Sequence, residues 1–469
     1  MGMEPTSTPA PIMNALIDKV AQASSLRIAR RQAGSLRYLL AALAIAGLVA
    51  SVRASDIIPA PAQARPIALK GATIHPVSGP EIPSGTIVFA NGNITAIGVD
   101  APVPAGSEVI DVAGKHIYPG LISANSVLGL IEISAARATV DIQESGAINP
   151  SARSISSINP DSELLPVARS NGILTALVVP EGGLVSGQSA VLRMDGWTPD
   201  EMTVRAPGAM HLRWPNLTID RDPRARKKVE DQQKDIDKAQ KTIREAFQIA
   251  RAYAQARKTP PPGFQSDLRW EALAPVLEGK LPLFVHADSM SQIEAALAWA
   301  KEAQLKIVLV GGREAWRMAA RLKESDTPVI IALTTALPPR RGDPYDSAFS
   351  NPARLHEAGV RFCIATEGRG SEATNERNLA YEAAMASAFG LPKDEALKAV
   401  TLYPAQLVGV ADRLGSLEAG KAATLLVTNG DPLDFPTQIE AAYIDGRKID
   451  LSNRQTRLRD KYRDKYLRK

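Results

Sequence analysis

The sequence predicts an α/β fold in which buried parallel strands alternate with crossover helices, as a barrel or as an open sheet. Short apolar segments rich in Val, Ile and Leu recur through the middle of the chain, a pattern typical of strands covered on both faces. Amphipathic helical segments at 291–304 and 314–325 lie between successive strands, as crossover connections require. The predicted strands lie within 172–180, 281–287, 305–312, 328–334 and 360–368.

Both ends of this region carry β segments of a different kind, with alternating polar and apolar residues and tight turns. Residues 66–122 alternate in this way, and Asn91-Gly92 marks a two-residue hairpin. Residues 415–450 show the same pattern, with a second hairpin in 443–449. We therefore expect the two segments to complete one sheet, although most of the chain lies between them.

The amino-acid composition indicates a globular protein and excludes several classes of function. With 469 residues, 45% of them hydrophobic and 22% charged, the chain is globular and long enough to bury a substantial core. The first 64 residues hold six Lys and Arg against three Asp and Glu, whereas the remainder holds 49 against 47. A near-neutral body argues against an electrostatic nucleic-acid binder. The single cysteine, Cys363, excludes disulfides and a Cys-rich zinc site, and its apolar neighbours predict a buried, inert thiol.

Residues 1–64 are predicted to form a leader. The apolar segment 38–52 follows several basic residues, and its 15 residues suit a signal peptide but are too few to span a bilayer of about 30 Å comfortably. Small residues follow at cleavage-like spacing. We expect export, with a periplasmic or secreted body. An uncleaved anchor is the alternative, and it also places the body outside the cytoplasm.

Two charged helices are predicted. Residues 224–258 form a solvated helical insertion that ends before the prolines at 260–262. Residues 451–469 form a basic C-terminal helix in which Leu458, Tyr462 and Tyr466 recur at i, i+4 and i+8. We expect this stripe to pack on the body and leave a solvated basic face. Contact with a membrane surface or an acidic partner is the alternative.

Three sequence motifs, together with the α/β pattern, make the chain resemble a known protein family. They are "GKHIYPGLI" at 114–122, "NLAYEAAMASAFGLPKDEALKAVTLYPAQLVGV" at 378–410 and "DRLGSLEAGKAATLLV" at 412–427. Together with the α/β pattern, the chain resembles the metal-dependent amidohydrolase superfamily, especially its exported, imidazolonepropionase-like members. The resemblance implies a (β/α)8 TIM barrel beside a composite β-sandwich built from both chain ends. The implied domains are a barrel at 119–409, interrupted by the insertion at 224–258, and a sandwich made of 65–118 and 410–450.

The resemblance also implies a metal site at the mouth of the barrel. In that family the first strand ends in His-x-His, and further ligands are a bridging carboxylated lysine or a carboxylate, one His each on strands five and six, and an Asp on strand eight. Here the first pair falls on Asn125 and Val127, and the strand-six position falls on Gly311 or Gly312. Valine and glycine offer no side-chain donor, and a neutral amide is a weak zinc ligand. The sequence therefore predicts a degraded metal-ligand set.

His286 and Glu367 are the candidate catalytic and metal-binding residues. His286 stands at the family's strand-five position, and Glu367 lies near its strand-eight aspartate. Barrel sites form at the C-terminal ends of strands, so each side chain is a candidate ligand, base or acid. We expect at most one divalent metal ion, zinc, and no binuclear centre, because a catalytic zinc has three protein ligands. The other histidines are interpreted as structural, although the placement of His211 stays open.

Two polar segments supply candidate substrate-binding residues. Segment 180–191 combines glycines with hydroxyl and amide groups and either contacts a ligand or forms a tight structural turn. Segment 366–378 concentrates charge at the end of the last strand and either binds a carboxylate-bearing ligand or forms a solvated loop. The candidate substrate-binding residues are Asn125, Ser186, Gln188, Asp288, Arg369, Asn375 and Arg377.

Two functions follow from these observations. The first is a hydrolase that acts on a C–N bond in a small molecule or peptide-like compound, with His286 and Glu367 in the site. The second is a non-catalytic binding or partner protein that keeps the barrel pocket without the metals. The expected partners are a small-molecule ligand and a second copy of the chain or an active relative. We expect no nucleic acid and no membrane span after removal of the leader.

Overall fold

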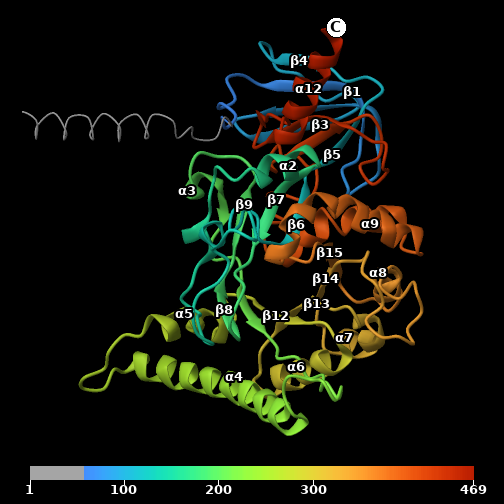
Figure 1. Ribbon diagram of the computed structural model, residues 1–469. Helices are drawn as coiled ribbons and strands as arrows, with labels where there is room; N and C mark the ends of the chain where they lie inside the picture. Colours follow the sequence, from blue (N-terminus) through green and yellow to red (C-terminus); the bar gives the residue numbers. More distant parts are fainter. Residues whose placement is uncertain (1–57, 469) are drawn as a thin grey trace, which may run out of the picture. The chain divides into compact units, whose positions relative to one another are not determined.

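The computed structural model of the protein describes residues 58–468 (Figure 1). The apolar segment 38–52 and most of the predicted leader lie outside the described residues, so the leader stays a prediction. Among the helices of residues 58–468, none combines the length and the apolar character needed to cross a membrane.

An eight-stranded sheet joins the two ends of the chain, as the sequence predicts. Its strand order is β18-β17-β16-β5-β1-β2-β3, with β4 paired to β1, and the junction is the antiparallel pairing of β16 with β5. Asn91 and Gly92 both have positive φ angles, 51° and 84°, which is the geometry of the expected hairpin turn. The strands are β1 (Ile67–Ile74), β2 (Ile82–Ala90), β3 (Asn93–Gly98), β4 (Glu108–Asp111), β5 (His116–Pro119), β16 (Leu425–Thr428), β17 (Ile439–Ile444) and β18 (Arg447–Lys448).

Two further sheets form the middle of the chain. One has the order β15-β14-β13-β12-β11-β8 and the other β10-β9-β7-β6. Strands β11 to β15 run parallel to one another, and β6 runs parallel to β7, as predicted for the α/β region. Strands β8, β9 and β10 pair antiparallel, so both sheets are mixed. The strands are β6 (Leu121–Ser126), β7 (Ile173–Val178), β8 (Val185–Gln188), β9 (Ala190–Arg193), β10 (Thr203–Arg205), β11 (Met210–Arg213), β12 (Leu283–Ala287), β13 (Ile307–Gly311), β14 (Val329–Ala332) and β15 (Phe362–Ala365).

The two sheets do not close into one hydrogen-bonded barrel. Between β6 and β15 the ladder is replaced by the backbone that precedes α11. There the Ile122 amide donates to the carbonyl of Val400 and the Ile364 amide donates to the carbonyl of Ala399, each at 2.9 Å. The inserted backbone thus accepts one hydrogen bond from each edge strand in place of a direct ladder between them. The coarser α/β prediction holds, whereas the closed (β/α)8 barrel is not confirmed.

The helices include the predicted crossovers. Segment 291–304 corresponds to α6, and 314–325 forms η3 followed by α7. The helices are η1 (Arg137–Thr139), η2 (Ser154–Ser157), α2 (Leu164–Ser170), α3 (Pro199–Met202), α4 (Val229–Lys258), α5 (Leu268–Leu277), α6 (Met290–Glu302), η3 (Ala315–Met318), α7 (Ala319–Glu324), α8 (Asn351–Glu357), η4 (Gly370–Asn378), α9 (Leu379–Ala388), α10 (Lys393–Lys398), α11 (Leu402–Leu407) and α12 (Arg454–Leu467).

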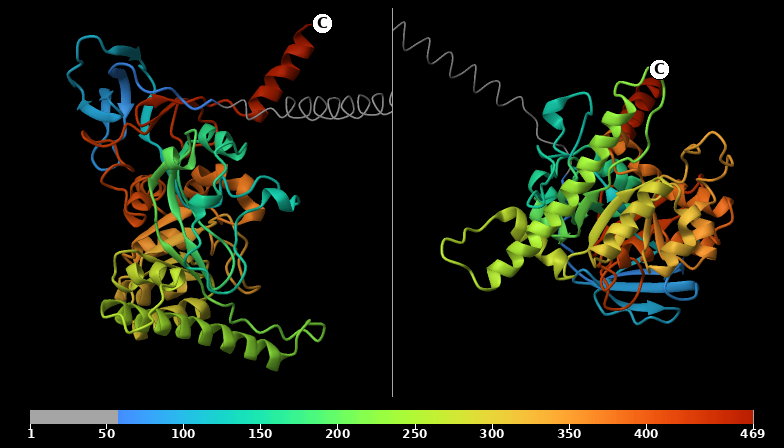
Figure 2. Two further views of the ribbon diagram at one scale, coloured as in Figure 1. Left: turned by 90° about the vertical axis from the view of Figure 1, so that its left-hand side faces the viewer. Right: turned by 90° about the horizontal axis from the view of Figure 1, so that it is seen from below.

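The predicted insertion helix α4 is long and mostly solvated, and one short apolar stripe attaches it to α6. Only Ile243, Ala246, Phe247 and Ala250 of its residues are buried. The Phe247 ring packs edge-on against Trp299 of α6, with ring centroids 5.0 Å apart. The helix extends along the molecule (Figures 1 and 2), and most of its charged residues are exposed.

The C-terminal helix α12 contradicts the prediction that its Leu/Tyr stripe packs on the body. None of its residues is buried, and Leu458, Tyr462 and Tyr466 are 42%, 51% and 64% exposed. The reason is that the helix is attached only at its start. There the buried Asn453 caps the helix and donates to the hydroxyl of Ser170 (2.9 Å). Beyond the first turns the helix leaves the body (Figure 2).

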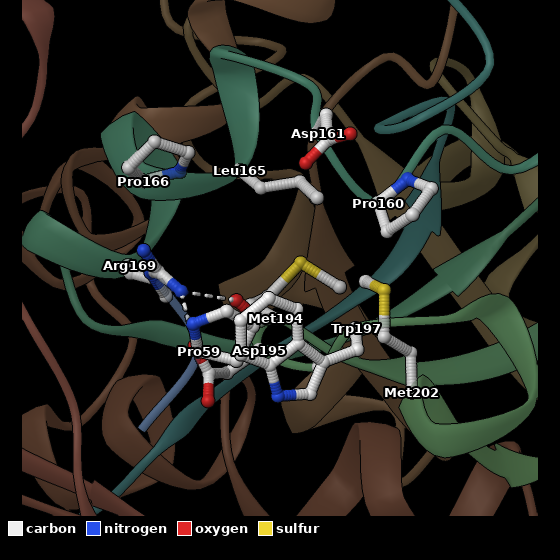
Figure 3. A pocket seen from close by; sticks show the side chains of 11 residues that line it. Pro59, Pro160, Asp161, Leu165, Pro166, Arg169, Met194, Asp195, Trp197 and Met202 are labelled. Carbon is white, nitrogen blue, oxygen red and sulfur yellow. Dashed lines mark hydrogen bonds and ion pairs between the residues drawn. The ribbon is translucent and has the colours of Figure 1, made fainter. Parts of the chain in front are cut away.

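A buried ion pair connects Ala60, near the first described residue, to the central core. The Arg169 guanidinium donates to the Asp195 carboxylate at 2.6 Å, and both side chains are almost completely buried. The second carboxylate oxygen accepts the Ala60 amide at 3.1 Å. A cavity of about 20 Å³ lies beside the pair (Figure 3). Burying two charges is costly unless they are paired and hydrogen-bonded. Each side chain of this pair therefore offsets part of the desolvation cost of the other.

Candidate functional site

Two histidines meet at the ends of neighbouring strands. His211 on β11 and His286 on β12 approach each other with Nδ1 and Nε2 2.9 Å apart. His211 is fully buried and His286 half-buried. Burial and the nearby positive charge of Arg213 lower the pKa of both imidazoles well below 6.5. Both rings are therefore neutral at neutral pH, so one N–H group donates to the lone pair of the other ring.

The sequence reasoning placed His286 at a strand end but missed its partner His211. His211 lies on a short strand, "MHLR", that has no long apolar run to reveal it. The signal that was available is the alternation of His211 and Arg213, which puts two polar side chains on the same face of one strand. The structure shows that this face meets the polar end of β12.

Acidic and basic side chains from three strand ends form a cluster around Glu367. Arg313, after β13, places Nη2 2.7 Å from the Glu367 carboxylate, and Arg369 places Nε 3.3 Å from it. Asp288, after β12, lies farther away, 4.0 Å from Arg313 and 3.9 Å from Arg369. The structure thus brings together three sequence-predicted residues, Glu367, Asp288 and Arg369, and adds Arg313. Because Glu367 is engaged by two guanidinium groups, it is better suited to positioning them than to accepting a proton.

Arg213 adds a third guanidinium next to the histidine pair. It follows His211 by two residues on β11 and donates from Nη2 to the carbonyl of Pro180 at 3.2 Å. Its Nε is buried without a hydrogen-bond partner. Burial lowers the pKa of Arg213, while the carboxylate of Glu181 opposes that change. An unpartnered guanidinium N–H is a donor available to an anionic group at this end of the sheet.

Asn125 has a structural bond pattern at the end of β6. Its Nδ2 donates to the carbonyl of Thr366 at 3.2 Å and to that of Glu367 at 2.9 Å. It thereby connects β6 to the segment that follows β15. Gly368, at φ 62°, makes room for this contact, because a Cβ at that position would overlap the Asn125 amide. The amide nitrogen predicted to contact substrate is therefore used within the protein.

Glu376 is a buried carboxyl group that the sequence reasoning did not single out. It lies on η4, is 1% exposed, and accepts a hydrogen bond from the Thr366 hydroxyl at 2.9 Å. Its other oxygen is buried without a partner. Burial raises the pKa of Glu376 to about 7, against the opposing effect of the nearby Ser123 and Thr366 hydroxyl groups. The group is thus close to half-protonated at neutral pH.

The remaining predicted substrate-binding residues lie on β8 or on η4. Ser186 is buried on β8 with its hydroxyl unpartnered, and β8 pairs with the strand of His211. Gln188 donates to the carbonyl of Pro150 at 3.3 Å. Asn375 and Arg377 are exposed on η4, and Asn375 donates to Glu372 rather than to the Glu367 cluster. Ser186 is therefore close to the histidine strand, whereas the η4 pair faces solvent.

The other histidines and the cysteine lie outside the Glu367 cluster and the His211–His286 pair. His75 and His116 contact each other in the eight-stranded sheet, with ring nitrogens 3.0 Å apart. His356 on α8 lies 3.6 Å from the carboxylate of Glu395. Cys363 is completely buried, and burial raises the pKa of its thiol, which keeps it protonated and unreactive.

Comparison with known proteins bears on the fold. Residues 312–452 match the sequence model of the amidohydrolase family. The crystal structure of an amidohydrolase from Thermotoga maritima superposes with a TM-score of 0.71 at 25% identity, covering 82% of this chain and 99% of that one. Over residues 312–452 in sequence, and in its fold, the chain is similar to proteins of the amidohydrolase superfamily.

Two curated relatives are similar to most of the chain. An imidazolonepropionase of Mesorhizobium japonicum is 26% identical over 375 residues, which is 74% of this chain and 86% of the relative. The amidohydrolase tasK of Hapsidospora irregularis is 23% identical over 393 residues. That alignment covers 77% of this chain but only 39% of tasK, so the chain spans about two fifths of that protein.

Amidohydrolases are typically dependent on divalent metal ions. The positions at which the resemblance places metal ligands include Val127 and Gly311 or Gly312, which have no side-chain donor in this chain. Val127, at a predicted ligand position, is completely buried in an apolar cluster with Ile131 and Ala373. Gly311 and Gly312 have φ angles of 103° and 62° and close neighbours on their Cβ side, so larger residues would be strained there.

The histidines do not replace the side-chain donors that are missing at Val127, Gly311 and Gly312. Within residues 58–468, no three His, Cys, Asp or Glu side chains are grouped so that they could hold a metal ion. The two nitrogens of the His211–His286 pair are one donor short of the three protein ligands of a catalytic zinc. Glu367, the other predicted metal ligand, is paired with arginines instead. The side chains at this strand end therefore suit acid–base and anion-binding chemistry better than metal binding.

Proposed function

We propose that this chain hydrolyses a C–N bond in a small, carboxylate-bearing amide or lactam and that it does so without a binuclear metal centre. The observation that carries the proposal is the pair of neutral histidines, 2.9 Å apart, beside three arginines at the ends of β11, β13 and β15. The family, together with relatives named amidohydrolase and imidazolonepropionase, supports a C–N hydrolase.

His286 is the general base in this proposal. Its lowered pKa keeps the imidazole neutral, which is the form that accepts a proton from water. The hydroxide oxygen then forms a bond to the carbonyl carbon, and the proton passes from His286 to the departing nitrogen as the C–N bond breaks. The products are a carboxylic acid and an amine, with one water consumed. His211 orients the His286 ring through the 2.9 Å contact.

The arginines bind the negative charges of the substrate and of the reaction. The side chain of Arg369 is 54% exposed, so it reaches a ligand carboxylate from the solvent side of Glu367. Guanidinium groups bind carboxylates in a bidentate geometry, which favours a substrate that carries one. Arg213 has an unpartnered N–H beside the histidines, which suits stabilisation of the oxyanion that forms on the carbonyl oxygen.

The proposal also covers the domain architecture, the cellular location and the partner of the protein. We propose a (β/α)8 barrel at 119–409 with a composite β-sandwich of 65–118 and 410–450, supported by the sheet that pairs β5 with β16. A leader at 1–64 would direct the protein out of the cytoplasm, supported by the apolar segment 38–52. A second copy or an active relative in that compartment is the proposed protein partner.

A second candidate is a binding protein that holds the same class of molecule without turning it over. The observation that favours it is the loss of side-chain donors at Val127, Gly311 and Gly312, which removes the family's usual means of activating water. Both candidates share the arginine-lined binding site, so they differ only in whether His286 performs chemistry.

The test compares His286→Ala with a matched control, His356→Ala, which removes a half-buried histidine on α8. Each protein is assayed for ligand binding and for turnover on a panel of carboxylate-bearing amides and lactams. General-base loss predicts a fall in kcat/KM of about 10²–10⁴-fold for His286→Ala, and no such fall for His356→Ala. Binding without turnover by the unaltered protein would establish the second candidate, and equal activity of the two variants would refute the role of His286.

A further inference from the structure

Helix α12 presents a complete face to solvent. All its described residues are half-exposed or exposed, and its contacts with the body are confined to its first turns. Those contacts are the Asn453 cap on Ser170 and an ion pair between Arg457 and Glu163 at 3.4 Å. The remaining length extends away from the sheets, where Figure 2 shows it. A helix held in this way is oriented, and the rest of residues 58–468 does not cover its outer face.

Helical geometry sorts the residues of α12 into three strips. At about 100° per residue, Leu458, Tyr462 and Tyr466 form one apolar strip along the axis. The acidic residues Asp460 and Asp464 fall on the opposite side of the helix. Basic residues flank the apolar strip on both sides, with Arg454, Lys461 and Lys465 along one edge and Arg459 and Arg463 along the other.

This arrangement identifies the kind of surface that fits the helix. Residues 454–468 hold seven Lys and Arg against two Asp. Two such helices would repel each other, so a second copy of α12 is a poor occupant. Tyrosine side chains favour the boundary between headgroups and acyl chains, and Lys and Arg extend from that boundary to lipid phosphates. An apolar strip with basic residues on both edges is the pattern of helices that lie in a membrane surface.

We propose that α12 is a docking surface for an anionic lipid membrane. Leu458, Tyr462 and Tyr466 enter the boundary below the headgroups, and the two basic edges contact lipid phosphates. In this proposal the helix lies in the membrane surface and does not cross it. The attachment at Asn453 would hold the body of the protein at the membrane surface.

The test measures binding of the full chain to vesicles by co-sedimentation. One set contains phosphatidylcholine with about a quarter phosphatidylglycerol, and the other contains phosphatidylcholine alone. We expect binding to the anionic set that weakens between about 50 mM and about 500 mM salt. The triple variant R454Q/K461Q/K465Q should bind at least about tenfold more weakly, because each basic residue near the surface adds to the attraction.

A matched control removes the same charge elsewhere. The variant K234Q/K238Q/K241Q neutralises three exposed lysines of α4 and should bind like the unaltered chain. The variant L458S/Y462S/Y466S keeps the charge and should also bind more weakly. All variants carry the same N-terminal segment, so differences among them report on α12. Equal binding by the α12 and α4 variants would overturn the proposal. So would binding of poly-glutamate without binding of anionic vesicles, which would indicate an acidic protein partner.

Discussion

Replacing Glu376 by Gln should remove a large part of the pH dependence of folding stability. The Glu376 carboxyl is 1% exposed and its pKa is raised from 4.5 to about 7, chiefly by burial. The folded state therefore holds a proton that the unfolded state releases between these two pH values. The contribution of Glu376 to the free energy of unfolding is therefore largest below about pH 4.5. It falls as the pH rises to about 7 and does not change further above that pH.

The size of the effect follows from the same values. A rise of the pKa from 4.5 to about 7 corresponds to about 3 kcal/mol of stability lost on ionisation. Gln keeps the shape of the protonated acid and can accept the hydrogen bond from Thr366, but it cannot ionise. The variant should therefore match the unaltered protein near pH 4.5 and exceed it by up to about 3 kcal/mol at pH 8.

The assay is urea unfolding followed by fluorescence, repeated across this pH range for both proteins. The histidines His211 and His286 have lowered pKa values and change stability in the opposite direction, becoming unfavourable as the pH falls. They are present in both proteins, so the difference between the two curves isolates Glu376. The exposed Glu357 provides a control, since Glu357→Gln should leave the curve unchanged. A pH-independent difference between Glu376→Gln and the unaltered protein would refute the reasoning.

Three further predictions concern the core and the site. Asp195→Asn leaves the Arg169 guanidinium buried without its counter-charge and should lower the free energy of unfolding by about 3–5 kcal/mol in a denaturant titration. Gly368→Ala forces a Cβ onto the Asn125 amide at a positive φ and should cost more than about 1 kcal/mol; a double-mutant cycle with Asn125→Ala should recover part of that loss, and strict additivity would contradict the contact. Because the pKa of His286 lies well below 6.5, kcat/KM should stay level as the pH is lowered to 6.5 and fall only below it, whereas a fall centred above pH 6.5 would exclude this base.

The buried strands of the α/β region were predictable, because a strand covered on both faces appears in the sequence as a short run of apolar residues. The apolar segments at 281–287, 305–312 and 328–334 contain β12, β13 and β14. The hairpin at Asn91-Gly92 was equally readable, since few other residues adopt two successive positive φ angles. These features depend on residues adjacent in sequence.

Features that depend on distant residues were missed. The seam between β6 and β15 is filled by the backbone of Ala399 and Val400, and no local pattern reveals such an insertion. The burial of Glu376 depends on how η4 folds over the strand ends, which composition does not show. The stripe on α12 was expected to be buried because periodicity reveals a face but not whether a partner covers it.

The site was half predictable for the same reason. His286 and Glu367 stand at the ends of recognisable strands, so their positions could be inferred. Their partners lie on other strands. Only the structure shows that His211 contacts His286 and that Arg313 contacts Glu367. That Val127 offers no side-chain donor is evident from the sequence itself, because an apolar residue cannot become a ligand in any fold. The degraded metal-ligand set as a whole stays a prediction.

The most direct measurement is the metal content of protein purified without chelators, determined by mass spectrometry on the same sample that is assayed for turnover. The account predicts far less than one divalent ion per chain, together with hydrolysis that survives dialysis against a chelator. Two ions per chain, lost together with activity on chelation, would show that side chains around His286 hold a binuclear centre and would contradict the account.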